Sequence, residues 1–292
     1  ALKGRPGITA INVFGLAVGL AACLLIGLWV EQQLSYDTFH PEAENVYRVA
    51  LDVELPGRSL SAPVAPAPMA NALRRDVPAV ESVVRLQRQS DVGVQVGDRG
   101  FTEDRVYAAD SSFFGVFGGF TLLRGNPRTA LADADAVVLT RSTAERYFGR
   151  TDVLGATLRM DGRTRRVTGV VADVPATSHF HFDLLTALQV PPPLRGTWMA
   201  NSFHTYVRLD ERHQRAAFAE TLQGFVETYV GPQAAQALGV PADRWLSQNE
   251  WRYVPQRLTE IYLHSDLQNE MEPVGSIAYV WTFAAVALFS KD

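Results

Sequence analysis

The sequence predicts an α+β fold in which an N-terminal membrane helix carries a large external domain, followed by the start of a second membrane helix. Four observations predict it. An uncharged apolar run occupies residues 8–30, mostly polar residues follow it, and a shorter apolar run lies at residues 277–289. Strand-like and helix-like periodicities alternate as β-α-β near both ends of the polar part.

The first apolar run is long enough to cross a bilayer. At about 1.5 Å per residue it would extend roughly 34 Å, against about 30 Å for a hydrocarbon core. Lys3 and Arg5 precede the run, and Glu31 and Asp37 follow it. Because positive charge favours the cytoplasmic side, this asymmetry predicts a cytoplasmic N-terminus and an external domain.

The single cysteine, Cys23, lies within this run, so the sequence offers no pair for an intrachain disulfide. Residues 20–23 resemble a lipoprotein cleavage site, which leaves lipidation of Cys23 or a cleaved signal peptide as alternatives. We favour a retained helix because the chain stays strongly apolar through residue 30. Gly15 and Gly19 form a G-x-x-x-G pair, which either packs against another helix or reflects how common glycine is in membrane helices.

The residue pattern at each end of the external domain predicts a β-α-β unit. The first unit has its strand, helix and strand at residues 46–55, 68–76 and 80–86. The second has them at residues 203–209, 215–229 and 251–258. Antiparallel pairing of two such units predicts a ferredoxin-like or porter-like sandwich, and each unit adjoins an apolar run.

The middle of the domain has short strands separated by glycine-containing turns. We expect strands at residues 92–96, 101–108, 136–140, 156–160 and 165–172. Asp161 and Gly162 suit a two-residue hairpin turn, and Thr140 can cap a short helix that Gly149 ends. These features predict an inserted β-rich subdomain.

The predicted organisation therefore has five segments. Residues 1–30 hold the cytoplasmic N-terminus and first membrane helix, and residues 274–292 hold the start of the second. The second run is short for a span, so a buried C-terminal helix of the external domain is the alternative. Residues 31–90 and 190–273 form the porter-like subdomain, and residues 91–189 form the insert.

Composition argues against two classes of function. The formal net charge of −4 and the lack of a basic stripe argue against nucleic-acid binding. Lys3 and Lys291 are the only lysines, and neither follows a glycine. The chain therefore has no Walker A loop and is not itself a P-loop ATPase.

The most metal-like cluster is His179, His181 and Asp183, whose spacing would place three ligands on one face of a strand. We favour a loop here, anchored by Phe180 and Phe182. The remaining polar candidates lack an activating motif and are interpreted as structural: Ser35, Asp37, His40, Asp133, Asp135, His204 and His264. We therefore predict no catalytic, cofactor-binding or metal-binding residues.

Several segments resemble, in order, the permease subunit of MacB/FtsX-type ABC transporters, including the MacB-like periplasmic core domain. They are INVFGLAVG (11–19), SYDTFH (35–40), NVYRV (45–49), VLT (138–140), AERYFG (144–149), VTGVVADVP (167–175), SHF (178–180), IYLHS (261–265) and GS (275–276). The ordered set covers nearly all of the chain.

The resemblance implies a non-catalytic permease subunit driven by a separate cytoplasmic ABC ATPase. Motion would pass through the membrane helices to a periplasmic domain that handles drugs, peptides or lipoproteins. It also implies a multi-pass protein of the bacterial inner membrane, whose partners are the lipid bilayer, a second permease copy or unit, and a periplasmic adaptor. No cofactor is implied.

We expect residues 35–40 and 261–265 to act as junctions between the membrane helices and the domain. The main alternative function is a membrane-anchored periplasmic sensor or protein-interaction domain without transport. An anchored periplasmic enzyme is a third hypothesis, and it would need a convergent polar pocket.

Overall fold

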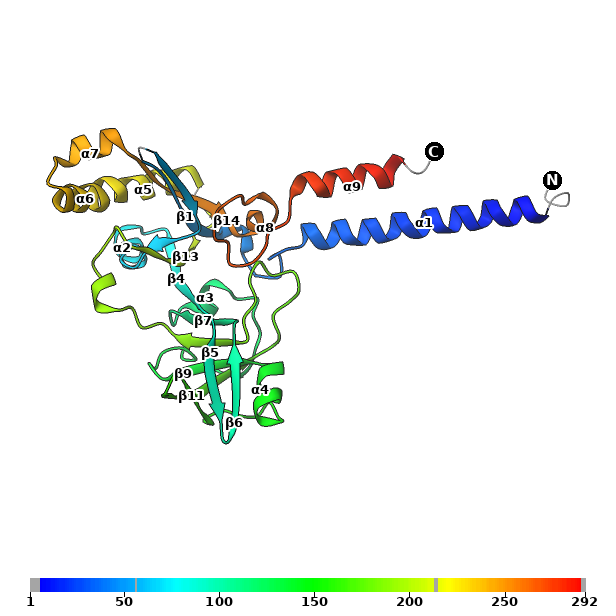
Figure 1. Ribbon diagram of the computed structural model, residues 1–292, viewed down its shortest axis with the longest axis horizontal. Helices are drawn as coiled ribbons and strands as arrows, with labels where there is room; N and C mark the ends of the chain where they lie inside the picture. The colour runs from blue at the N-terminus through cyan, green and yellow to red at the C-terminus, as the bar shows by residue number, and fades with distance from the viewer. Residues whose placement is uncertain (1–5, 56, 213–214, 290–292) are drawn as a thin grey trace.

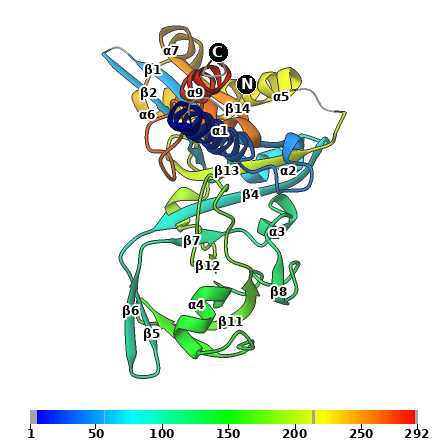
Figure 2. The same cartoon turned by 90° about the vertical axis from the view of Figure 1, so that its right-hand side faces the viewer.

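The computed structural model describes residues 6–55, 57–212 and 215–289 (Figure 1). A β-rich domain lies at one end, and two helices, α1 (Pro6–Leu34) and α9 (Ile277–Phe289), extend from it in the same direction. The two helices lie next to each other when viewed toward their ends (Figure 2). Their contact includes the rings of Trp29 and Phe283, whose centroids are 5.2 Å apart.

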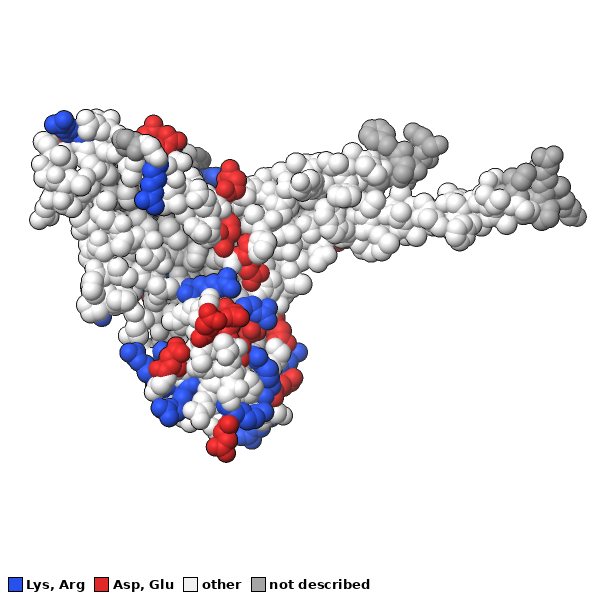
Figure 3. Space-filling view, viewed as in Figure 1, with Lys and Arg blue, Asp and Glu red and all other residues white. Residues whose placement is uncertain are grey.

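The apolar side chains of α1 are exposed along its length. Ile11 and Phe14 are each 72% exposed, and the most apolar stretch within Thr9–Leu34 has a mean hydropathy of 2.5. On the face shown in Figure 3, charged side chains gather over the domain and not over the two helices. The expected first helix is therefore confirmed, and its length and composition suit a membrane span.

Helix α9 is apolar but has only 13 residues. It packs beside α1, and its side chains are mostly exposed, with Tyr279 at 68% and Trp281 at 60%. The structure therefore does not show the alternative of a C-terminal helix buried in the external domain. That α9 begins a second membrane span stays a prediction.

Four strands next to the two helices form an antiparallel sheet in the order β14-β1-β13-β4. They are β1 (Val46–Leu55), β4 (Val80–Gln89), β13 (Asn201–Leu209) and β14 (Glu250–Arg257). Helix α2 (Met69–Asp76) connects β1 to β4, and α5 (Arg215–Phe225) begins the connection from β13 to β14. This is the ferredoxin-like order, so the two predicted β-α-β units are confirmed.

The sheet continues from β4 through the order β7-β12-β9-β11-β10-β5-β6. The additional strands are β2 (Arg58–Ala62), β3 (Ala65–Pro66), β5 (Val92–Val96), β6 (Arg99–Glu103), β7 (Val106–Ala109), β8 (Leu122–Gly125), β9 (Ala136–Thr140), β10 (Thr157–Met160), β11 (Arg163–Val171) and β12 (Leu184–Ala187). The further helices are α3 (Phe113–Val116), α4 (Arg141–Phe148), α6 (Gly231–Leu238), α7 (Ala242–Gln248) and α8 (Ile261–His264).

We propose that residues 91–189 are an insert in the porter-like subdomain. Strands β4 and β13 pair as neighbours although this whole segment lies between them in the chain. One cluster of buried apolar side chains belongs to the β-α-β units, as in Leu73 and Phe218, and another belongs to the insert, as in Val137 and Leu158. A third cluster, rich in phenylalanine, joins the two parts beneath the helices.

Two local predictions are confirmed at residue level. Asp161 and Gly162 have φ angles of 47° and 78°, as a type I′ turn between β10 and β11 requires. The side chain of Thr140 accepts a hydrogen bond from the Thr143 N–H, and Gly149 ends α4 with φ of 70°.

Two other predictions need correction. The strand expected at residues 101–108 is split into β6 and β7, because the Asp104 side chain binds the backbone N–H of Asp91 and the Arg105 carbonyl accepts from Asp183. The helix expected at residues 215–229 instead becomes a π-helix at Val226–Val230 and leads into α6 and α7, which periodicity did not predict.

Candidate functional site at the helix–domain junction

The junction comprises residues 35–40, which follow α1, and helix α8 with the linker at residues 266–276, which leads into α9. At the end of α1, the hydroxyls of Ser35 and Thr38 donate to the carbonyls of Gln32 and Ser35, at 2.9 and 2.8 Å. These bonds satisfy carbonyl groups that a helix leaves unpaired at its C-terminus. They fix the path from α1 toward the domain.

The two helix attachments contact each other directly. The rings of Tyr36 and Tyr262 are parallel, with centroids 3.3 Å apart. The Tyr262 hydroxyl donates to Gln33 Oε1 at 3.0 Å, and its carbonyl accepts from the Gly275 N–H at 2.8 Å. These contacts join the end of α1 to α8 and to the residues just before α9.

Asp37 is fully buried and connects the junction to the loop at residues 173–183. Its Oδ1 lies 2.8 Å from His179 Nδ1 and also accepts the His179 N–H. His179 Nε2 lies 2.8 Å from the Tyr206 hydroxyl on β13, which donates to the Met271 sulfur at 3.3 Å. One chain of contacts thus joins the α1 turn, the sheet and the linker.

His40 is also buried and lies against the phenylalanine cluster. Its Nδ1 accepts the Gly119 N–H at 3.1 Å, and its ring packs on Phe117 and Phe120. Burial lowers the pKa of His40 to about 4, so the ring is neutral at neutral pH. It therefore acts as a hydrogen-bond acceptor that positions the 35–40 segment.

Arg48 is the centre of the linker's attachment to the sheet. Its cross-strand neighbours are Tyr206 on β13 and Gln256 on β14, which lie on the same face. The buried guanidinium donates to both carboxylate oxygens of Glu270, at 2.6 and 2.7 Å, and also to Gln256. Burial acts to raise the pKa of Glu270, but the Arg48 guanidinium holds it below its usual range.

A second ion pair holds the linker two residues further on. His181 Nδ1 lies 2.7 Å from Glu272 Oε2, and the His181 N–H donates to the other oxygen at 2.8 Å. The hydrogen bond with Glu272 raises the pKa of His181. Burial acts to raise the pKa of Glu272, but the hydrogen bond with His181 holds that pKa below its usual range.

This pair predicts a pH dependence of linker attachment. Because the pKa of His181 is raised, His181 contributes fully to the stability of the folded protein below about pH 6.5. This contribution disappears as pH rises through the raised pKa. Glu272 contributes above about 4.3, and that contribution disappears as pH falls through its lowered value. Between these limits we expect the Tm of the full chain to be highest, and a plot of Tm against pH should show a decrease on the alkaline side of about pH 6.5.

The His181→Asn variant should lose this alkaline decrease in Tm, whereas His264→Asn should keep it because His264 is exposed on α8. An alkaline decrease that is equal in wild type and His181→Asn would show that the pair is not its origin.

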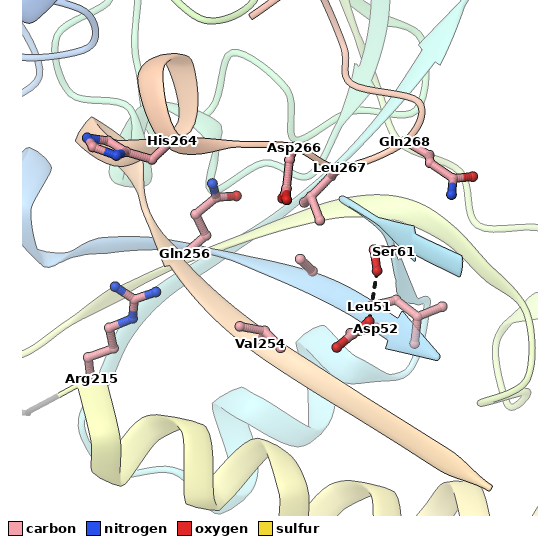
Figure 4. Close-up of a pocket in the computed structure, with 11 residues that line it drawn as sticks. Leu51, Asp52, Ser61, Arg215, Val254, Gln256, His264, Asp266, Leu267 and Gln268 are labelled. Atoms are coloured by element: carbon pink, nitrogen blue, oxygen red, sulfur yellow. Dashed lines mark hydrogen bonds between the residues drawn. The ribbon is translucent and has the colours of Figure 1, made fainter. Parts of the chain in front are cut away.

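A cavity of about 510 Å³ lies between the linker and the outer face of β1 and β14 (Figure 4). His264 and Asp266 on the linker side face Gln256 and Val254 of β14 across it. At the edge of the cavity, the Gln268 N–H donates to the Ser61 carbonyl at 2.8 Å. The linker is therefore fixed at separate points with free volume beneath it, and it is not packed along its whole length.

The structure separates the residues of the metal-like cluster. His179 contacts Asp37, His181 contacts Glu272, and Asp183 forms an ion pair with Arg105 at 3.1 Å. The strand that would have aligned them is absent from this part of the described chain, where a loop lies instead. Its anchors are as expected, since Phe180 is 0% and Phe182 2% exposed.

The other polar candidates also have separate partners. Ser35, Asp37 and His40 bind Gln32, His179 and Gly119, so they do not form a catalytic arrangement with one another. The remaining contacts are Asp133 and Asp135 with Arg166, and His204 with the Pro63 carbonyl. Among the described residues, no group of three His, Cys, Asp or Glu side chains is placed to hold a metal ion.

Sequence reasoning missed Arg48, Tyr206, Glu270 and Glu272. One signal was available, because Arg48 lies in a strand whose neighbours are buried on both faces. An arginine there needs an acidic partner. No pattern points to Glu270, which lies 222 residues away in a loop.

The fold and the junction define an external α+β domain whose two ends connect to adjacent apolar helices. A family model for the MacB-like periplasmic core domain matches residues 9–225, and the chain belongs to this family, which forms the periplasmic domain of ABC-transporter permeases. Among curated proteins, no sequence match is found.

Solved structures with the same fold include a domain assigned to a permease protein from Porphyromonas gingivalis, at 21% identity and a TM-score of 0.62, covering 75% of this chain and 91% of that one. The periplasmic region of MacB from Actinobacillus actinomycetemcomitans matches at 18% identity and a TM-score of 0.48, with the same coverage of both chains. The extracellular domain of the ABC-type transporter YknZ from Gram-positive bacteria matches at 14% and 0.43, covering 73% of this chain and 100% of that one.

Proposed function

We propose that this chain is the N-terminal part of a transporter permease subunit and passes motion from its membrane helices to the periplasmic domain. The observation that carries this proposal is the connection of both helices to neighbouring strands. Helix α1 leads through residues 35–45 into β1, and β14 leads through α8 and the linker into α9. Because β1 and β14 pair along most of their length, relative motion of the helices would act on one sheet.

The energy for this motion would come from a separate cytoplasmic ATPase of the ABC type, and residues 1–292 contain no Walker A loop. The proposal includes the bacterial inner membrane as location, further membrane spans, a second permease copy or unit, and export or extraction of a substrate at the periplasmic side. A periplasmic adaptor would be a further partner.

Affinity purification of the natural full-length protein from solubilised membranes tests the ATPase partner. We expect mass spectrometry to find a P-loop ATPase in stoichiometric amount. Recovery of the protein without any ATPase would instead favour the membrane-anchored sensor or interaction domain.

Fixing the linker to β2 with a disulfide tests whether the linker transmits motion between the membrane helices and the domain. In a Cys23→Ala background, the Ser61→Cys and Gln268→Cys pair replaces residues whose backbones share a hydrogen bond, so their Cα atoms should lie near the roughly 4.4–6.8 Å that a disulfide spans. In the purified complex, we expect ATP to change hydrogen exchange in residues 266–276. Oxidation should abolish that change, and dithiothreitol should restore it.

The matched control is Glu54→Cys with Ser59→Cys, which joins a cross-strand pair of β1 and β2 away from the linker. Its oxidation should leave the ATP response intact. An ATP response that survives oxidation of the linker pair would contradict transmission through this linker.

A further inference from the structure

A buried histidine at the junction lies between a carboxylate and a phenol. The ring nitrogens of His179 are 2.8 Å from Asp37 Oδ1 and 2.8 Å from the Tyr206 hydroxyl oxygen. The same hydroxyl is 3.3 Å from the sulfur of Met271, a buried residue of the linker. The four side chains belong to the turn after α1, the loop at residues 173–183, β13 and the linker, so they connect all of these segments.

The Tyr206 hydroxyl has one proton and two acceptors within reach. Burial raises the pKa of Tyr206, so the phenol keeps this proton. A thioether sulfur can only accept a hydrogen bond, and a ring nitrogen accepts only when it carries no proton. The hydroxyl can therefore donate to Met271 while a protonated His179 Nε2 donates to the hydroxyl oxygen, or it can donate to His179 and release Met271.

The Asp37 carboxylate requires a proton on the other ring nitrogen. Its Oδ1 accepts the backbone N–H of His179 and faces Nδ1, and an ionised carboxylate can only accept, so Nδ1 is a donor. Its Oδ2 is closed to solvent and has no hydrogen-bond partner among the described residues. A proton on Oδ2 would therefore lack an acceptor, whereas a proton on His179 Nε2 is bound by Tyr206.

The charges around the ring act in both directions. Asp37 is fully buried, and within the described chain His179 is its one partner in ion-pair distance, so a protonated ring supplies the countercharge that a buried carboxylate needs. Glu270 also attracts a positive charge on His179, and Arg48, which pairs with Glu270, opposes it. Two neighbouring rings stay neutral, because burial lowers the pKa of each to about 4: His40 and His204.

We propose that His179 is a buried imidazolium and a proton-dependent switch for attachment of the linker. In the protonated form, His179 Nε2 donates to the Tyr206 oxygen, and the Tyr206 hydroxyl donates to Met271. When Nε2 gives its proton to water, the hydroxyl turns to donate to Nε2, and Met271 loses its hydrogen bond. The linker is therefore held more tightly at low pH. The switch does not depend on the proposed transport function.

Hydrogen exchange of the full chain in lipid nanodiscs, measured over a series of pH values, tests the switch. The His181→Asn background removes the other pH-dependent contact of the linker, and protection factors correct each rate for the intrinsic effect of pH. We expect protection of residues 266–276 to decrease about threefold as the His179 ring loses its Nε2 proton, which is the scale of one weak hydrogen bond. The nitrogen chemical shifts of the ring should show both nitrogens protonated at low pH.

Three variants in this background distinguish the contacts. Tyr206→Phe removes the hydroxyl, and Met271→Leu removes the acceptor at similar volume, so each should abolish the pH response of the linker. Asp37→Asn retains a residue type that tolerates the φ of 59° at this position, but it removes the charge that stabilises the imidazolium. It should shift the pH response, and the loss of the Nε2 proton, to lower pH.

Tyr253→Phe is the matched control. Tyr253 is also a buried tyrosine, but its hydroxyl binds Asn201 at 3.0 Å and not the linker, so the pH response should persist. Linker protection that stays constant while the His179 ring loses its proton would overturn the proposal, as would an undiminished response in Met271→Leu. A ring with a single proton at every pH would overturn the imidazolium. None of these measurements involves an ATPase, so their failure leaves the proposed function untouched.

Discussion

Replacing Arg48 by methionine should detach the linker from the sheet and lower the free energy of unfolding by about 3–5 kcal/mol. Arg48 is completely buried, and its partner Glu270 is only 9% exposed. Removing the guanidinium leaves a buried carboxylate without a counterion, and it also removes the donors to Gln256 and Ser265. We expect faster hydrogen exchange in residues 266–276 and a lower midpoint in thermal unfolding of the full chain.

The Arg252→Met variant is the matched control. Arg252 lies on β14 and pairs with Asp52 at 3.0 Å, but its side chain is 51% exposed. Exposed pairs contribute about 0–1 kcal/mol, so this variant should remain close to wild type. The double variant Arg48→Met with Glu270→Met should recover part of the lost stability, because no buried charge then remains. If Arg48→Met and Arg252→Met lowered stability equally, the buried pair would not be the main attachment of the linker.

The parts of the fold that follow from local patterns could be predicted. An uncharged apolar run of this length predicts helix α1, because only a membrane-type helix leaves so many apolar side chains exposed. Alternation in β1 and helical spacing in α2 arise from the periods of strand and helix, and these periods are visible in the sequence. The Asp161–Gly162 turn and the Thr140 cap depend on residues adjacent in the chain, so they too could be located.

The junction could not be predicted because its contacts join distant segments. Asp37 and His179 are separated by 142 residues, and Arg48 and Glu270 by 222. Each looks like an ordinary polar residue in its own segment. The spacing of His179, His181 and Asp183 suggested a common face, but burial of Phe180 and Phe182 turns the histidines toward different partners.

Replacing Gly119 by alanine should displace the segment at residues 35–40, with a loss of about 3 kcal/mol in the free energy of unfolding. A Cβ added there would lie 2.6 Å from the Phe39 carbonyl oxygen and 2.7 Å from His40 Nδ1. The first neighbour is backbone and cannot rotate away. His40 cannot move freely either, because its ring is enclosed by Phe117 and Phe120. Chemical unfolding of the full chain measures the loss.

Gly118→Ala provides the control one residue away. Its added Cβ would meet Pro41 at 3.7 Å, which is ordinary contact, so stability should be nearly unchanged. The comparison also bears on transmission, because the Gly119 N–H is the donor to His40, and His40 belongs to the covalent connection from α1 into β1. If the path transmits motion, Gly119→Ala should weaken the ATP-dependent change in residues 266–276, and Gly118→Ala should not. A Gly119→Ala protein as stable as Gly118→Ala would show that the 35–40 segment accommodates the clash and is not rigidly positioned.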